Sequence, residues 1–292
     1  MARDGLSVIE KVSLILERFL DERTTSLGFN EIISGTPLSR GTAHRLLTDL
    51  TEQGMLSQDA HRDEYRLGPT LVSVGALAQE ASSVGERSIP KMEALRDEFG
   101  ETVVLAELHE DSVVPVRRVD GVHEMRMNQE LGRRYPAYAG ATGQVLLAHE
   151  EPARLAVYLR GLRIKPLTGA TVGTVKELRA VLDRIKRAGV AVSLGQRVPE
   201  AVAISAPIFD RSGRLCYALT ISGVASRWDR ERVLLAGQVV KEAAELISRE
   251  SGYRLDADEP SAADLKDPGS EPYALLDESC GRIFAVGARV GA

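Results

Sequence analysis

The sequence predicts an α+β protein built from two domains. Its 292 residues suffice for two domains of ordinary size, and a hydrophobic content of 43% can bury substantial cores. Helical apolar periods and a short pair of strands fill residues 1–68, whereas residues 102–224 alternate between strand-like runs and helical periods. Helices are expected on both sides of this second region, which indicates a sheet with helices packed on it.

Two helices are expected first, at 7–21 and 30–34. The first opens with Ser7 and Glu10 at the spacing of a capping box, in which each side chain bonds the backbone N–H of the other residue. The second starts at Asn30, because asparagine is a favourable N-cap. A proline seven residues further on sets its end, since the residue before a proline is disfavoured in a helix.

A third helix is predicted at 39–53, with Ser39 as its N-cap and Gly54 as its C-terminal stop. Its apolar residues recur at helical spacing on one face, namely Ala43, Leu46, Leu47 and Leu50. Two short strands follow at 54–59 and 64–68, joined by a polar turn. Three helices and a two-stranded ribbon are typical of a winged helix-turn-helix, in which the second helix of the pair enters the major groove.

The first turns of helix 39–53 carry hydrogen-bond donors and positive charges outside the apolar face. These residues are Ser39, Arg40, Thr42, His44 and Arg45. Acidic residues are normally favoured at a helix N-terminus, so we expect DNA phosphates to supply the missing negative charge. We therefore predict that these five side chains contact double-stranded DNA, and that Arg62 and Arg66 of the ribbon reach the flanking backbone or minor groove.

The charge distribution limits DNA binding to a local patch. The net charge is −5, and residues 256–292, with 8 acidic and 3 basic side chains, account for all of it. Residues 1–70 contain 8 basic and 11 acidic groups, so the prediction rests on the start of one helix and not on the isoelectric point. No apolar run is typical of a membrane span or a signal peptide, and two cysteines indicate no disulfide framework. The expected location is a reducing cytoplasm, with no membrane partner.

The elements of the second domain follow in order after a helix at 86–100. Alternating runs predict strands at 102–108, 112–119 and 123–131. Helices are expected near 141–149, 152–160 and 175–188. Further strands are expected at 191–195, 203–210 and 215–223, before a last helix at 234–252.

Six extended blocks of the chain carry a family resemblance. In the N-terminal half they are SVIEKVSLILERFLD (7–21), LSRGTAHRLLTDLTEQGMLSQD (38–59) and YRLGPTLVSVG (65–75). In the C-terminal half they are YAGATGQVLLA (138–148), AISAPIFDRSGRLCYALTISGVASR (203–227) and LLAGQVVKEAAELISRESG (234–252). In order and spacing these blocks resemble the isocitrate lyase regulator (IclR) family of bacterial transcription factors. The resemblance covers about residues 6–253, and Thr36-Pro37 stands where the family usually has Leu-Gly.

The resemblance implies a domain plan and a function. A winged helix-turn-helix at 1–68 is followed by a linking helix at 69–84 and by a GAF-like effector-binding domain at 85–253. Two chains pair to read a pseudo-palindromic operator, giving a homodimer or a dimer of dimers, and a small-molecule effector shifts the population of DNA-binding arrangements. Repression and activation both stay open. The competing interpretation is a metabolite-binding or enzymatic protein that uses the winged helix for protein interactions.

Recognisable catalytic and cofactor motifs are absent from the sequence. There is no nucleophile elbow, no phosphate-binding glycine loop and no paired-histidine metal motif. The histidines His109, His123 and His149 stand alone, and Cys216 has the apolar neighbours of a small core side chain. The sequence therefore predicts neither an enzyme nor a bound cofactor or metal.

The resemblance places the effector pocket between the sheet and the loop at 138–143. Small residues there expose backbone N–H groups that suit a carboxylate or carbonyl oxygen, and Ser222 matches a serine that points into the site. Met125, Met127 and Tyr138 would form an adaptable apolar wall. The full set of candidate residues is Met125, Met127, Tyr138, Ala139, Gly140, Ala141, Gln196, Arg197, Ala203 and Ser222.

The sequence departs from the family pattern near this pocket. Many relatives have an acidic run where this chain has Ser-Leu-Gly-Gln at 193–196, and a cysteine where it has Ala203. Arg197 follows directly, so the pocket is less negative than is usual. The effector is then either an anion, such as a carboxylate, held partly by Arg197, or a more apolar molecule bound by Val202, Ala203 and Met127. The sequence leaves both open.

The acidic tail at 254–292 lies beyond the resemblance. Its first half is rich in Asp, Pro and Ser, a composition that predicts disorder. The stretch RIFAVGARV (282–290) is apolar enough to dock on the body of the protein, and Cys280 has no expected role.

Overall fold

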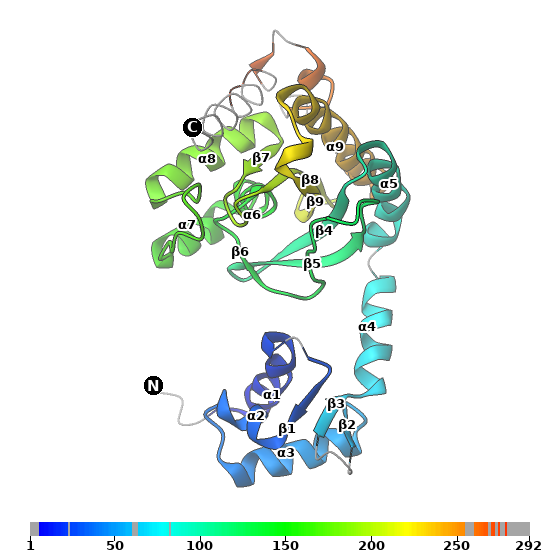
Figure 1. The fold of residues 1–292 in the computed structure, drawn as a ribbon, viewed down its shortest axis with the longest axis vertical. Coiled ribbons are helices and arrows are strands. Elements are labelled where there is room, and N and C mark those ends of the chain that lie inside the picture. Colours follow the sequence, from blue (N-terminus) through cyan, green and yellow to red (C-terminus); the bar gives the residue numbers. More distant parts are fainter. Residues whose placement is uncertain are drawn as a thin grey trace. The chain divides into compact units, whose positions relative to one another are not determined.

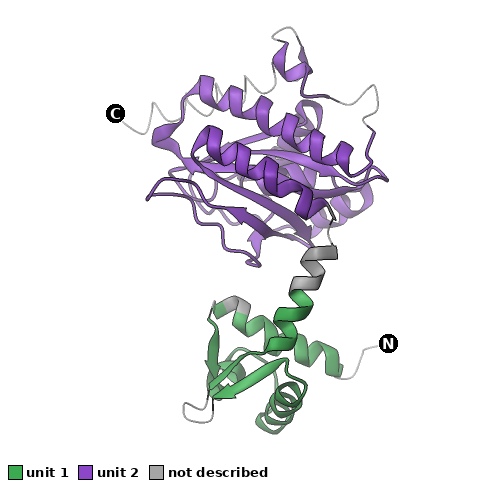
Figure 2. Cartoon of the chain, turned by 90° about the vertical axis from the view of Figure 1, so that its right-hand side faces the viewer, with its two compact units in different colours: residues 1–82 green, residues 83–292 purple. Residues whose placement is uncertain are grey.

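The chain forms two compact units in the computed structural model, residues 1–82 and 83–292 (Figures 1 and 2). The structure describes residues 6–22, 24–59, 64–81, 83–254 and 260–267, with residues 270, 271, 274 and 278. Within these ranges no helix is both long and apolar enough to cross a membrane.

The first unit packs helices against a small antiparallel sheet (Figure 1). Its elements are α1 (Val8–Glu22), β1 (Ser26–Gly28), α2 (Phe29–Ser34), α3 (Arg40–Glu52), β2 (Leu56–Asp59), β3 (Glu64–Leu67) and α4 (Pro69–Ala81). The apolar face predicted for α3 is buried, together with Ile15 of α1 and Ile32 of α2. The winged helix-turn-helix predicted from the sequence is confirmed.

Two of the predicted helix starts are set by local hydrogen bonds. Ser7 Oγ accepts from the Glu10 N–H at 3.2 Å, and Glu10 Oε2 accepts from the Ser7 N–H at 2.6 Å, which is the predicted capping box. Ser39 Oγ accepts from the Thr42 N–H at 3.3 Å, so Ser39 is the N-cap of α3 as predicted.

The region around α2 differs from the prediction in two ways. Glu31 Oε2 accepts from the Gly28 N–H at 2.7 Å, so Gly28 is the N-cap and Asn30 lies inside the helix. The ribbon also gains a third strand, β1, in which Leu27 pairs with Tyr65 of β3. A three-residue strand shows no period of its own, and its partner is distant in the sequence.

A six-stranded antiparallel sheet forms the centre of the second unit, in the order β6-β5-β4-β9-β8-β7. Its elements are α5 (Ser83–Phe99), β4 (Thr102–His109), β5 (Ser112–Val119), β6 (Tyr135–Pro136), α6 (Ala141–Ala148), α7 (Pro152–Gly161), α8 (Val175–Ala188), β7 (Ala191–Leu194), β8 (Ala201–Phe209), β9 (Leu215–Val224) and α9 (Arg230–Glu250). The predicted α+β class is confirmed, and all but one of the predicted strands and helices are present in the expected order.

Helices cover both faces of this sheet, as the period of β4 shows. Val103 and Leu105 belong to the core that includes α5 and α9, whereas Val104 and Ala106 belong to the core that includes α6 and α8. Successive side chains of a strand point to opposite faces, so a continuous apolar run serves both cores.

Helix boundaries in the second unit differ from the predictions by a few residues. The expected linking helix at 69–84 spans the end of α4 at Ala81 and the start of α5 at Ser83. The last helix, α9, begins at Arg230 and not at residue 234, because Asp229 Oδ1 accepts from the Arg232 N–H at 2.8 Å and caps it.

The third predicted strand, 123–131, is a loop between β5 and β6. Side chains take the backbone groups that a strand ladder would need: Arg118 donates to the Gln129 carbonyl at 3.1 Å, and the Glu130 N–H donates to the Tyr135 hydroxyl at 3.2 Å. The alternation of polar and apolar residues in this segment therefore does not produce a two-faced strand.

The tail differs from the expectation of disorder where the structure describes it, at residues 260–267. Leu265 is fully buried in the core beneath α9, and its carbonyl accepts from Gln238 Nε2 at 2.7 Å. The Ala262 N–H donates to Glu245 Oε1 at 2.7 Å. Ala262 and Leu265 are both buried, and these two apolar side chains dock a segment whose average composition is acidic. The stretch 282–290 and Cys280 lie outside the described residues.

Candidate DNA-binding surface and ligand pocket

The start of α3 presents an exposed group of cationic and polar side chains. Arg40, His44 and Arg45 are exposed, and none of them pairs with a carboxylate within the described part of the chain. Phe29, at the start of α2, holds two of them: the Arg40 guanidinium lies 5.2 Å from its ring centroid, and the His44 ring meets it edge-on at 5.9 Å. Ser39 and Thr42 share a hydrogen bond of 2.9 Å between their hydroxyls. The α3 side chains predicted to contact DNA thus gather at one helix end.

The ribbon arginine Arg66 lies beside two acidic side chains. Arg66 Nη2 lies 3.7 Å from Asp59 Oδ2 and 3.9 Å from Glu64 Oε2, so two carboxylates of the ribbon partly neutralise it. This arrangement makes Arg66 a weaker candidate for DNA contact than the α3 arginines. Arg62 lies outside the described residues.

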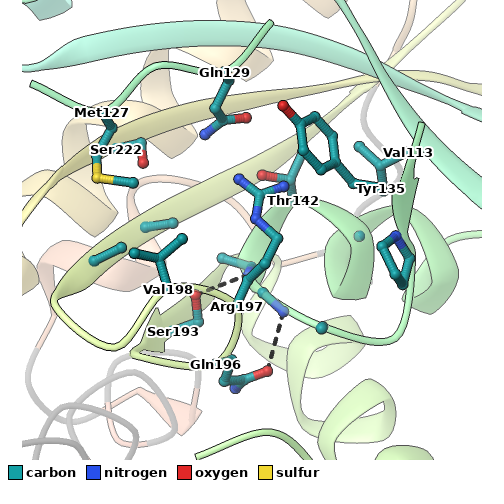
Figure 3. A pocket seen from close by; sticks show the side chains of 17 residues that line it. Val113, Met127, Gln129, Tyr135, Thr142, Ser193, Gln196, Arg197, Val198 and Ser222 are labelled. Atoms are coloured by element: carbon teal, nitrogen blue, oxygen red, sulfur yellow. Dashed lines mark hydrogen bonds between the residues drawn. The ribbon is translucent and has the colours of Figure 1, made fainter. Parts of the chain in front are cut away.

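A small pocket of about 30 Å³ lies in the second unit at the start of α6 (Figure 3). The loop before β6 and the segment after β7 supply two of its walls. Eight of the candidate residues line it, namely Met127, Ala139, Gly140, Ala141, Gln196, Arg197, Ala203 and Ser222. Eight of the ten candidates therefore lie around one cavity, and three of them, Gln196, Arg197 and Ser222, are polar or charged.

Two candidates are corrected by their positions. Met125 is 72% exposed and does not line the pocket, although Met127 and Gln129 of the same loop do. Tyr138 is buried in the core beside α6 and α8, and its hydroxyl donates to the Lys165 carbonyl at 2.9 Å. Neither side chain forms the apolar wall expected of it.

Sequence reasoning missed about half of the lining. The residues not anticipated are Val113, Gln129, Tyr135, Pro136, Thr142, Gly143, Val198, Ala201 and Ser193. Strand register provides a signal for the last of these, because Ser193 pairs with Ala203 on β8, and Ala203 pairs with Ser222 on β9. These three small residues form one row across the sheet, and two of them were identified.

The backbone donors expected to be free for a ligand are already bonded. The Gly140 N–H donates to Gln196 Oε1 at 3.1 Å, and the Ala141 N–H donates to Ser193 Oγ at 3.0 Å (Figure 3). Gly140 has a φ of 93°, a left-handed conformation that favours glycine. The loop thus has the expected conformation, but Gln196 and Ser193 occupy its donors.

Arg197 is the one charged residue among the described residues that line this pocket. It is half-buried, and its guanidinium lies 4.1 Å from the ring centroid of Tyr135, toward which it extends in Figure 3. Burial lowers the pKa of Arg197 from its usual value, although an arginine keeps its charge in a protein. None of the described residues that line the cavity is Asp or Glu, so its electrostatic potential favours an anion.

A second, more open cleft lies where α6 ends, beside β9, and its groups are poorly suited to catalysis. Burial lowers the pKa of His149 to about 4, and burial raises the pKa of the Cys216 thiol to about 11. Cys216 is half-buried at this cleft and not in the core, because its thiol turns toward the Arg214 carbonyl. A protonated thiol is a poor nucleophile at neutral pH. No group of three potential metal ligands occurs among the residues with described positions.

Comparison with known proteins identifies the family. Residues 8–60 match the IclR helix-turn-helix domain, and residues 78–249 match the family described as bacterial transcriptional regulator IclR C-terminal. The HTH-type transcriptional regulator KdgR of Escherichia coli is 30% identical over 250 residues, which are 86% of this chain and 94% of that protein. The regulator KipR of Bacillus subtilis is 28% identical and is matched over its full length, by 87% of this chain.

A solved structure of a relative includes a bound small molecule. An IclR homologue from Microbacterium hydrocarbonoxydans, crystallised with 4-hydroxybenzoate, is 26% identical with a TM-score of 0.74, over 84% of this chain and 99% of that one. These relatives are named as transcriptional regulators and not as enzymes, in agreement with the motifs missing from the sequence. The chain belongs to the IclR family of bacterial transcriptional regulators.

Proposed function

We propose that this regulator reads its operator through the start of α3 and responds to a small carboxylate held in the pocket beside α6. The ligand class follows from Arg197, a half-buried cation in a cavity whose lining, in the described part of the chain, contains no acidic residue. A protein that binds a bacterial operator acts where the chromosome lies, in the cytoplasm.

The DNA-binding role rests on Arg40, His44 and Arg45. These side chains are exposed on α3, and Phe29 restricts two of them before DNA is bound. A restricted side chain loses less conformational entropy on binding. The N-terminal residues of a recognition helix face base edges and phosphates, and arginine suits both guanine edges and phosphate oxygens.

Replacing Arg45 by alanine should weaken operator binding by about 1–3 kcal/mol if its side chain reads a base. Preference at one operator position should be lost as well. Fluorescence anisotropy, with a fragment selected from genomic DNA over a series of salt concentrations, measures both. Arg66→Ala is the matched control, because two carboxylates already neutralise Arg66, and it should cost less. Equal affinity of Arg45→Ala and the parent for every fragment would remove α3 as the recognition helix.

Exposed apolar residues in the first unit support pairing of two chains. They lie on α1 (Val8 and Ile9) and on α4 (Val72 and Val74). If two of these helices meet the same helices of a second chain, the contact removes this apolar surface from water. A symmetric dimer with two recognition helices matches a pseudo-palindromic operator, and further association through the second units would give a dimer of dimers.

The carboxylate is favoured by the chemistry of the pocket and by a neighbour. Arg197 offers a planar fork that matches a carboxylate, while Val113, Met127 and Tyr135 supply apolar surface for the rest of a ligand. The related protein with 4-hydroxybenzoate bound holds an aromatic carboxylate. The alternative of a purely apolar ligand would leave the half-buried charge of Arg197 without a ligand group to pair with.

Replacing Arg197 by alanine should weaken binding of 4-hydroxybenzoate by about 1.5–3 kcal/mol, the usual cost of losing a hydrogen bond to a charged group. Operator affinity without ligand should not change. Isothermal calorimetry measures the ligand affinity, and Arg179→Ala on the exposed side of α8 is the control for removing an arginine. Ligand affinity equal to that of the parent would place Arg197 outside the binding site.

A further inference from the structure

The start of α6 takes its hydrogen-bond partners from side chains that are distant in the sequence. All residues of α6 are buried, and its N-cap, Gly140, has no side chain that can accept a bond. Buried N–H groups at a helix start need acceptors. Gln196 Oε1 accepts from the Gly140 N–H, and Ser193 Oγ accepts from the Ala141 N–H (Figure 3).

Two donors converge on the Gln196 oxygen. Besides the Gly140 N–H at 3.1 Å, Gln144 Nε2 donates to Gln196 Oε1 at 2.6 Å. The Gln144 side chain is fully buried and also donates to the Tyr138 carbonyl at 3.0 Å, which fixes its orientation. Convergent N–H groups at the positive end of a helix suit a charged oxygen better than the neutral oxygen of an amide.

The two acceptors differ in how freely they can leave. Ser193 is buried within β7, where it pairs with Ala203, so its hydroxyl cannot move away without disturbing the sheet. Gln196 lies in the segment after β7 and is half-buried. Thr171 Oγ1 donates to the Gln196 backbone carbonyl at 2.6 Å. The backbone is thus fastened, while the side chain can rotate about its own bonds.

We propose that Gln196 is an internal competitor for the ligand: its amide oxygen occupies the place of a ligand carboxylate oxygen, and the ligand binds by displacing it. The inference rests on the proposed carboxylate pocket and adds how that site selects its ligand. A carboxylate replaces a neutral acceptor by a charged one, whereas an uncharged carbonyl or hydroxyl only exchanges one neutral acceptor for another. The competitor therefore favours anions over neutral molecules of the same shape.

Calorimetry on the full chain tests this with two probes, 4-hydroxybenzoate and the matched neutral 4-hydroxybenzamide. Gln196→Ala removes the competitor and should tighten 4-hydroxybenzoate binding about 3- to 10-fold, because the two donors no longer have to release a protein acceptor before the ligand binds. Gln196→Glu fixes a carboxylate in the same place and should weaken it at least about 10-fold, because the new charge repels the ligand and holds the donors. The parent should prefer the carboxylate to the amide.

A measurement on the unsubstituted protein does not depend on how these substitutions affect the loop. In TROSY spectra of the ¹⁵N-labelled, deuterated protein, the Gly140 amide and the Gln196 side-chain amide should shift together at the same 4-hydroxybenzoate concentration. The Ala141 amide, which keeps Ser193 as its acceptor, should shift less.

The outcomes separate this inference from the proposed function. If Arg197→Ala weakens 4-hydroxybenzoate while both Gln196 variants bind it like the parent, the carboxylate pocket stands and the competitor is rejected. If the parent and Gln196→Ala bind neither probe, both proposals are rejected for aromatic carboxylates. Tighter binding by Gln196→Ala together with weaker binding by Gln196→Glu supports the competitor.

Discussion

Replacing Arg227 by alanine should lower the free energy of unfolding of the second unit by about 3–5 kcal/mol, the cost of leaving a buried charge without its partner. Glu101 is fully buried at the start of β4, and Arg227 grips both of its oxygens, with Nε–Oε1 and Nη2–Oε2 distances of 2.6 Å. Gly223 leaves the space for this contact, since a Cβ there would lie 2.6 Å from the Glu101 carboxyl carbon. Without the guanidinium, the carboxylate keeps its desolvation cost and loses the compensating charge.

The single tryptophan of the chain, Trp228, is the next residue and is buried, so its fluorescence during urea unfolding reports on this unit. Arg179→Ala removes an exposed arginine and should shift stability by less than about 0.5 kcal/mol. Glu101→Gln in the Arg227→Ala background should recover part of the loss, because it removes the buried charge. An Arg227→Ala variant as stable as the parent would mean that the pair contributes nothing.

Replacing Leu265 by alanine should cost about 2–5 kcal/mol, the usual range for truncating a fully buried leucine. Leu265 lies in a segment with no counterpart in the resemblance to the family, yet its side chain is fully buried in the core beneath α9. Its backbone is fixed by the bond from Gln238, and the preceding turn is fixed by the bond from Ala262 to Glu245. The segment 260–267 therefore acts as part of the second unit.

The neighbouring Lys266 provides the control for this prediction. Its ammonium pairs with Glu242 at 2.7 Å, but both side chains are about half exposed, and exposed pairs contribute about 0–1 kcal/mol. Lys266→Ala should therefore unfold at nearly the same urea concentration as the parent. If Leu265→Ala and Lys266→Ala behave alike, the segment does not dock on α9 in solution.

Much of the fold could be predicted because its signals are local. The capping box of Ser7 and Glu10 and the N-cap Ser39 depend on residues three apart, and the structure keeps both. The strand β1 depends on Leu27 meeting Tyr65, a contact between distant residues that no local period encodes. Helix α2 begins after Gly28 and not at Asn30, because Glu31 Oε2 accepts from the Gly28 N–H and this bond outweighs the preference of asparagine for the N-cap.

Site residues could be predicted where a block that resembles the family lies on neighbouring strands whose register brings its residues together. Ala203 and Ser222 lie side by side on β8 and β9 and line the cavity. The prediction for Met125 is wrong because it assumed a strand at 123–131, where bonds from Arg118 to Gln129 and from Glu130 to Tyr135 hold a loop instead. The occupation of the Gly140 donor by Gln196 was equally invisible, since 56 positions separate these residues.

The most direct test of the account is the operator affinity measured with and without saturating carboxylate, in the parent and in Gly140→Leu. Leucine at this position fills the pocket beside the loop, and the strain of its left-handed backbone makes a parallel unfolding measurement necessary. For the parent we expect the ligand to change operator affinity by about 5- to 150-fold, the usual range of coupling between two sites. Folded Gly140→Leu should bind the operator like the parent and show no response. An equal response in both chains, or none in the parent to any carboxylate, would contradict the account.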